Sequence, residues 1–115
     1  MRFTIFTTGL VAAIMSETVY GASCVRSQAV WGIVGYAINA QGVDDVPKVC
    51  GDLWSNLRRF HDCIGVGVPS CEKRGNNELV WNFSNGSGCN MGMVESTWWE
   101  ATQNRYGAIK CEIQY

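Results

Sequence analysis

The stretch DDVPKVCGDLWSNLRRFH, residues 44–61, decides the fold class, because its hydrophobic residues recur at three- and four-residue steps. On a helix these positions form one apolar face, made of Val46, Val49, Cys50, Leu53, Leu57 and Phe60. Asp44 or Asp45 can cap the start of this helix, and Pro47 suits its first turn. We therefore expect a helix over roughly residues 45–61.

Segments with strand character lie on both sides of this helix. Before it, AVWGIVGYAI (residues 29–38) favours one buried strand with a bulge at a glycine. After it, residues 64–69 and 79–83 favour two more strands, and residues 109–115 alternate strictly between apolar and polar side chains. A second helix is expected to start at Thr97, because Glu100 completes the spacing of a capping box.

The predicted order of elements is therefore strand, helix, strand, strand, helix, strand. Each helix must bury its apolar stripe against the sheet or against the other helix, so the order indicates an α+β fold. The natural topology is two helices packed on a four-stranded antiparallel sheet, in the ferredoxin-like split βαββαβ order.

Residues 1–21 have the features of a secretory signal peptide. Arg2 precedes an apolar run, and Val19-Tyr20-Gly21 supplies small residues before a cleavage site. The run is shorter than the roughly 20 apolar residues of a membrane span, so no stable membrane insertion is expected. Residues 22–115 then form a single disulfide-rich secreted domain.

Six cysteines are spread through that domain, and their even number favours disulfides over metal binding or thiol chemistry. No Cys-x-x-Cys pair occurs, so we expect no metal and no cofactor. Six cysteines allow fifteen connectivities. Cys50 on the helix stripe and Cys111 on the last strand favour a helix-to-sheet bridge. We expect a disulfide-stapled fold with the pairs Cys50–Cys111, Cys63–Cys71 and Cys24–Cys89.

Catalytic residue patterns are sparse. His61 is the only histidine, which disfavours a histidine pair, a serine triad and a multi-histidine zinc site. A trio of His61, one glutamate (Glu78 or Glu95) and one arginine (Arg58 or Arg105) leaves a ribonuclease-like hydrolase as an alternative. The net charge is −1 and only two basic pairs occur, so no nucleic-acid partner is expected.

The chain contains five tryptophans, and a small core is expected to hold three of them, including Trp81 and Trp98. Adjacent helical residues point about 100° apart, so Trp98 and Trp99 are hard to bury together. At least one of this pair, or Trp54, should therefore reach the surface. Trp54, Trp98 and Trp99 are accordingly the candidate binding residues, because exposed tryptophans are enriched at interaction hot spots.

Two glycosylation sequons begin at Asn82 and Asn85, where the sequence predicts the junction of a strand and a turn. Asn85 is expected to lie in the turn itself. It is therefore the better candidate acceptor of the two.

The leader MRFTIFTTGLVAAIMSETVYG, the short mature domain and its six dispersed cysteines resemble the small secreted cysteine-rich effectors of fungi. The alternation of helices and strands, with LWSNLRRF and YGAIKCEI, resembles the killer-toxin-like α/β sandwich group. The resemblance implies a non-enzymatic protein of a plant-colonising fungus. It would bind host proteins in the apoplast, at the host–fungus interface or after entry into host cells, and promote virulence or suppress defence. The alternatives are an antimicrobial or killer-type toxin and the small hydrolase described above.

Overall fold

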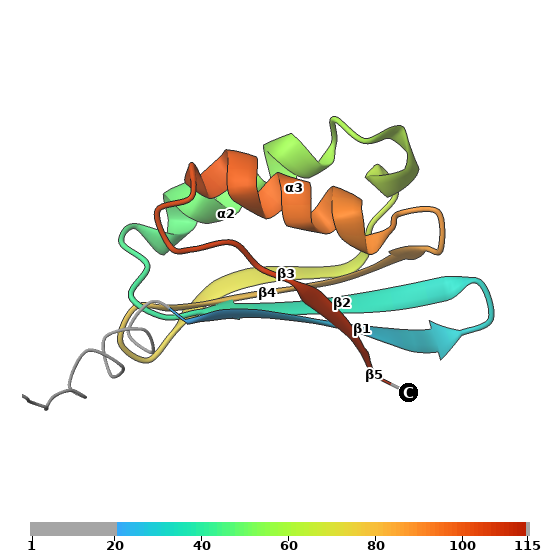
Figure 1. Cartoon of the computed structure of the whole chain (residues 1–115), viewed down its shortest axis with the longest axis horizontal. Coiled ribbons are helices and arrows are strands. Elements are labelled where there is room, and N and C mark those ends of the chain that lie inside the picture. Colours follow the sequence, from blue (N-terminus) through green and yellow to red (C-terminus); the bar gives the residue numbers. More distant parts are fainter. Residues whose placement is uncertain (1–20, 115) are drawn as a thin grey trace, which may run out of the picture.

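In the computed structural model, which describes residues 21–114, two helices pack on one face of a five-stranded sheet (Figure 1). The predicted signal peptide lies outside the described residues apart from Gly21. The elements, in chain order, are β1 (Ala22–Val30), β2 (Ile33–Ala40), α2 (Val46–Leu57), the short 3₁₀ helix η2 (His61–Cys63), β3 (Gly67–Arg74), β4 (Glu78–Gly86), α3 (Met91–Thr102) and β5 (Cys111–Gln114).

The α+β class is confirmed, but the expected four-stranded antiparallel sheet and its ferredoxin-like order are wrong. The strand order is β3-β4-β2-β1-β5. The first three pairs along this order, β3 with β4, β4 with β2 and β2 with β1, are antiparallel, whereas β5 runs parallel to β1. The sheet is therefore mixed, with β3 and β5 at its edges.

The extra strand arises because the predicted single strand over residues 29–38 is two strands joined by a tight turn. Val30 pairs with Ile33, and Gly32 in the turn has a φ of 80°, a conformation that glycine adopts without strain. The strand before the turn gave no hydrophobic signal. Its helix-facing positions include Arg26 and Gln28, and only Cys24 among them is buried.

The helix α2 follows the prediction in its apolar face and ends earlier than expected. Val46, Val49, Cys50, Leu53 and Leu57 are all buried, as the spacing predicts. Asp45 is the N-cap residue, but its side chain makes no capping hydrogen bond and its backbone is left-handed, with a φ of 51°. The chain leaves the α-helical path after Leu57 and continues into η2.

The helix α3 begins six residues before the expected start at Thr97. Its N-cap is Asn90, whose side-chain oxygen accepts a hydrogen bond from the Met93 N–H at 2.9 Å. Thr97 lies inside the helix and donates its hydroxyl hydrogen to the Met93 carbonyl at 2.9 Å. Two of the five buried positions, 97 and 102, are threonines. The helical period of the hydrophobic residues is therefore weak in the sequence.

The core between the layers contains a cluster of aromatic rings. Trp54 from α2 packs edge-on against Trp81 and Phe83 of β4, with ring centroids 5.6 and 5.8 Å apart. Tyr36 of β2 extends the cluster, with its ring centroid 5.3 Å from that of Phe83. These contacts fix α2 over the β3–β4 side of the sheet.

Three disulfides form, and their pairing differs from the predicted set. The bonded pairs are Cys24–Cys111, Cys50–Cys71 and Cys63–Cys89. Cys50 does bridge α2 to the sheet, but to edge strand β3, because α2 lies over β3 and β4 and far from β5. The three disulfides indicate folding in an oxidising compartment, as in an extracellular protein.

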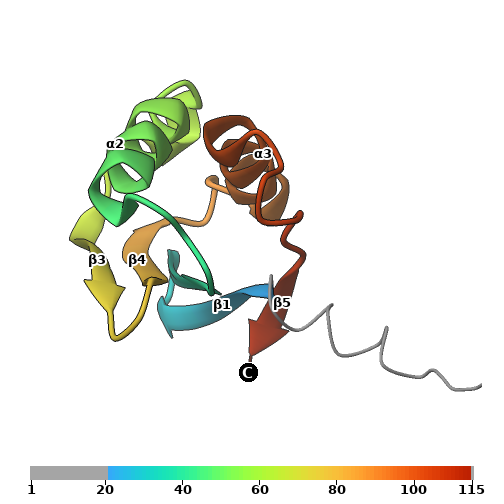
Figure 2. The same cartoon turned by 90° about the vertical axis from the view of Figure 1, so that its left-hand side faces the viewer.

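Figure 2 shows that both helices cover the same face of the sheet and that no described element covers the other face. The central strands place small side chains on that open face, among them Ser27, Gly35, Ala37 and Ser84. Among the described residues, neither helix is long and apolar enough to cross a membrane.

Candidate functional site

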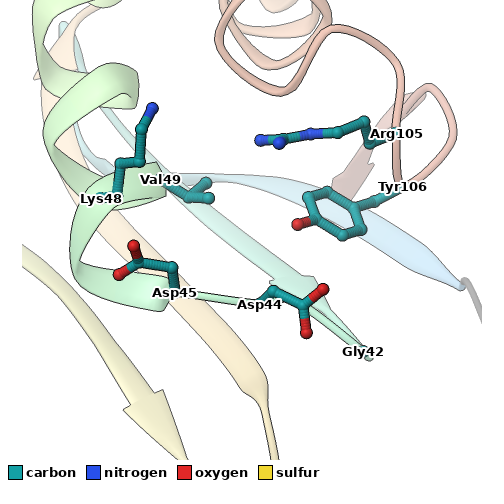
Figure 3. Close-up of a pocket in the computed structure, with 7 residues that line it drawn as sticks. All are labelled: Gly42, Asp44, Asp45, Lys48, Val49, Arg105 and Tyr106. Carbon is teal, nitrogen blue, oxygen red and sulfur yellow. The ribbon is translucent and has the colours of Figure 1, made fainter.

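A pocket of about 410 Å³ opens where α2 begins and the chain leaves α3 (Figure 3). It is lined by Gly42, Asp44, Asp45, Lys48, Val49, Arg105 and Tyr106. The β2–α2 connection supplies one wall, and the segment after α3 supplies the other. Four charged side chains and one phenol therefore surround a single small cavity.

Arg105 and Tyr106 are held firmly on their side of this pocket. The Arg105 Nε–H donates to the Thr102 carbonyl at 3.0 Å, and the guanidinium carbon lies 5.4 Å from the centre of the Tyr106 ring. Tyr106 is only 6% exposed, and Figure 3 shows its hydroxyl turned toward the α2 side of the pocket. The guanidinium extends across the pocket in the same direction.

On the opposite wall, Lys48 belongs to the first turn of α2, Asp45 is the N-cap of this helix and Asp44 precedes it. Lys48 is paired with a residue of its own helix, because its Nζ lies 2.9 Å from the Asp52 carboxylate. Within the described residues neither Asp44 nor Asp45 forms an ion pair. The expectation that one of these aspartates caps the helix through its side chain is therefore wrong, and both carboxylates are available to the pocket.

The arrangement can bind charged groups. Among the described residues the His61 side chain forms no hydrogen bond or ion pair with Glu78, Glu95, Arg58 or Arg105. His61 lies two residues before Cys63, whose carbonyl accepts a hydrogen bond from Asn85 near the end of β4. Glu78 is the first residue of β4 and therefore lies at the other end of that strand. Glu95 accepts a hydrogen bond from the Cys111 N–H at 2.8 Å. Among the described residues no group of three His, Cys, Asp or Glu side chains is placed to hold a metal ion.

A second candidate surface lies at the other end of the sheet, at the tip of the β1–β2 hairpin. Trp31 is 95% exposed there, and its neighbours Val30 and Ile33 are 61% and 37% exposed. The strand pairing brings the start of β3 to the same end, where Val68 is 85% exposed. Most of the exposed large hydrophobic side chains of the described chain therefore gather at this end.

The hairpin tip is held in place by hydrogen bonds to its backbone. The Ser87 N–H donates to the Gly32 carbonyl at 3.1 Å, and the Gln28 side-chain amide donates to the Val30 carbonyl at 2.9 Å. Because the backbone on both sides of Trp31 is held, less backbone freedom is lost when this residue binds a partner.

The strands at this end carry no charge. No Asp, Glu, Lys or Arg occurs in residues 27–43, 63–71 or 79–94. A charged side chain from η2, Asp62, lies against Gly88, next to the residue that bonds to Gly32. An apolar partner can therefore cover the strands at the tip without burying an unpaired charge of these strands.

The tryptophans predicted as binding residues lie in three different environments. Trp98 is fully buried, and its indole N–H donates to the Gly107 carbonyl at 2.8 Å, so it is a core residue. Trp54 is partly buried in the aromatic cluster. Trp99 is 47% exposed on α3 and remains a candidate. Sequence reasoning missed Trp31, because an apolar run without turn residues other than glycine reads as one strand.

The two predicted glycosylation sites are both within β4 and not in a turn. Asn85 is 5% exposed, its amide nitrogen donates to the Cys63 carbonyl at 3.1 Å, and its oxygen accepts from the Gly86 N–H at 2.9 Å. The folded protein therefore does not present Asn85 as an acceptor, contrary to the prediction. Asn82 points to the open face of the sheet between Ala37 and Ser70.

The charged pocket was also missed, because its two walls are about 60 residues apart in the sequence. The Asp44-Asp45 doublet is the one local signal, and from the sequence helix capping is the better explanation of it. In the comparisons with known proteins, no family model, no curated protein and no solved structure matches this chain.

Proposed function

We propose that this chain is a secreted, non-enzymatic binding protein that acts as an effector of a plant-colonising fungus, and that the β1–β2 hairpin tip is its contact surface for a host protein. The three disulfides support the extracellular part of the proposal, since cross-links stabilise a small domain in a protease-rich exterior. The resemblance of the leader and the cysteine distribution to fungal effectors supports the role in host colonisation.

The observation that carries the proposal is the 95% exposure of Trp31 at the tip of a fixed hairpin. Exposing a tryptophan to water at a rigid, uncharged end has no stabilising effect on the fold. Tryptophan is the residue most enriched among interface hot spots, where its truncation typically costs about 2–4 kcal/mol of binding free energy. Val30 and Ile33 beside it extend the apolar contact.

A protein partner fits this surface better than a nucleic acid. The strands around Trp31 carry no basic residue that could neutralise a phosphate. A host protein with an apolar pocket can receive the indole ring, and the polar side chains near the tip, such as Gln28 and Ser87, can form the rim of the interface.

Deletion of the gene tests the proposed role. The deletion strain should grow normally in culture and colonise its host less well, and purified protein should not inhibit the growth of other fungi. Normal colonisation by the deletion strain would contradict the effector role. Inhibition of competitors by the purified protein would instead support the toxin alternative.

A further inference from the structure

We propose that the pocket between α2 and the segment after α3 binds a small amino-acid zwitterion that carries an additional positive charge, of the type of free arginine or lysine. Its carboxylate would contact Arg105, and its two cationic groups would contact Asp44 and Asp45. This site lies at the opposite end of the sheet from Trp31, because β2 runs from Ile33 at the hairpin to Ala40 beside the pocket. The inference therefore stands independently of the proposed function.

Arg105 is positioned as a carboxylate receptor. Its Nε–H is bonded to the Thr102 carbonyl, and its plane lies near the Tyr106 ring, so the side chain is already oriented. Its remaining N–H groups form no hydrogen bond and no ion pair within the described residues. An oriented guanidinium with free N–H groups is suited to bidentate binding of a carboxylate.

Tyr106 supplies an independent sign that the pocket accepts a ligand. The residue is 94% buried, since its exposed fraction is 6%, yet its hydroxyl points into the pocket (Figure 3). Within the described part of the chain this hydroxyl forms no hydrogen bond, and its oxygen is open to the pocket and not sealed in the core. A ligand carboxylate beside Arg105 would accept a hydrogen bond from it.

The aspartates on the other wall favour cationic groups. Asp45 is the N-cap of α2 but does not use its carboxylate for capping, and Asp44 is exposed beside it. Lys48 does not compensate them, because its ammonium group is paired with Asp52 at 2.9 Å. Two carboxylates thus remain uncompensated on this wall.

The charges set the class of ligand. Two free carboxylates and one free guanidinium line the pocket, so it has an unbalanced charge of −1 after the Lys48–Asp52 pair is set aside. A neutral zwitterion such as alanine leaves one carboxylate without a partner, and an acidic amino acid adds a repulsive charge. A basic amino acid has one carboxylate and two cations, which matches the pocket group for group. The volume of about 410 Å³ is within the usual range of small-ligand pockets.

The test is a titration of isotope-labelled protein with free L-arginine, followed by amide chemical shifts. Two arginine analogues isolate the charges: agmatine lacks the carboxylate, and L-citrulline has a neutral side chain of nearly the same shape. We expect saturable binding of arginine with shifts at Gly42–Val49 and Arg105–Tyr106. Each analogue should bind about tenfold more weakly, because each loses a charge-assisted hydrogen bond.

Variants then assign each contact. Arg105→Gln should weaken arginine binding about tenfold and remove the preference for arginine over agmatine. Asp45→Asn should remove the preference for arginine over citrulline, and asparagine tolerates the left-handed backbone of this position. Arg74→Gln, an exposed change at the end of β3 and outside the pocket, is the matched control and should leave all three affinities unchanged.

The spectrum of each variant shows whether it is folded, so a loss of binding can be assigned to the pocket. The proposal would be overturned if arginine produced no saturable shifts, if the three ligands bound equally well, or if Arg105→Gln left arginine binding unchanged. If a Trp31 variant kept the effector phenotype, the proposed function would fail and the result for this pocket would stand.

Discussion

The sulfurs of Cys24 and Cys111 are bonded between directly opposed positions of β1 and β5, whose Cα atoms lie 4.4 Å apart. The strand β5 has only four residues and pairs with β1 alone. Its other anchor at this point is Glu95, whose carboxylate accepts a hydrogen bond from the Cys111 N–H at 2.8 Å. The disulfide therefore reinforces the backbone pairing of β5 with β1, and the Glu95 hydrogen bond ties the first residue of β5 to α3.

Replacing both Cys24 and Cys111 by alanine should release β5 and destabilise the domain. The disulfide closes a loop with a sequence separation of 87, which corresponds to about 4–5 kcal/mol in the chain-entropy account. Hydrogen exchange should show loss of protection in Cys111–Gln114. In the control, Cys50→Ala with Cys71→Ala, protection of β5 should persist. Equal protection of β5 in both double variants would contradict the assignment.

The sequence predicted the elements whose apolar residues follow a clear period, and missed those whose burial depends on tertiary contacts. The stripe of α2 and the alternation of β4 are visible because Val49, Leu53 and Trp81 are simply hydrophobic. The strand β1 gives no clear period, because its helix-facing positions include Arg26 and Gln28 and only Cys24 among them is buried. The disulfide pairing and the Arg105 pocket depend on how distant segments meet, which no local pattern specifies.

Trp81 and Trp98 are both fully buried, but only one of them satisfies its indole N–H among the described residues. Trp98 donates to the Gly107 carbonyl at 2.8 Å, whereas the N–H of Trp81 has no partner. Trp98→Phe should therefore destabilise the protein by about 1–3 kcal/mol more than Trp81→Phe, because it loses a hydrogen bond whereas Trp81→Phe removes a buried N–H that has no partner. Urea unfolding of the two variants measures the difference. A larger loss for Trp81→Phe would contradict the hydrogen-bond assignment.

Asn85 should act as a structural residue and not as a glycan acceptor. Asn85→Ala removes the hydrogen bonds to Cys63 and Gly86 and leaves a buried carbonyl without its donor, so we expect a loss of about 1–3 kcal/mol in unfolding free energy. Asn82→Ala on the open sheet face is the comparison and should cost less. Mass spectrometry of secreted protein should find residue 85 unmodified, and a glycan there would show that this site is accessible.

Burial raises the pKa of the Tyr36 phenol above its ordinary value of 10.0, although the nearby Arg26 partly opposes the rise. The unfolded chain therefore ionises this phenol at lower pH than the folded chain does. Stability from this group is complete below about pH 10 and falls as the pH rises further toward the pKa of the folded state.

Tyr36→Phe tests this relation. At pH 7 the variant should be less stable by about 1–3 kcal/mol, because it loses the 2.6 Å hydrogen bond to the Cys89 carbonyl. Above about pH 10 the difference should narrow, since only the wild type is destabilised by ionisation of this phenol. Urea unfolding at pH 7 and above pH 10 gives both values. A difference that is constant or grows with pH would be inconsistent with a raised pKa.

The most direct test of the central claim is complementation of the deletion strain with the Trp31→Ser variant. Trp31 is fixed at the hairpin tip but packs against little of the fold, so the variant should be secreted and should unfold within about 0.5 kcal/mol of the wild type. Ile113→Ser, at an exposed hydrophobic residue on β5 and outside every proposed binding surface, is the control. We predict that Ile113→Ser restores host colonisation and Trp31→Ser does not. Full restoration by a folded, secreted Trp31→Ser protein would contradict the account.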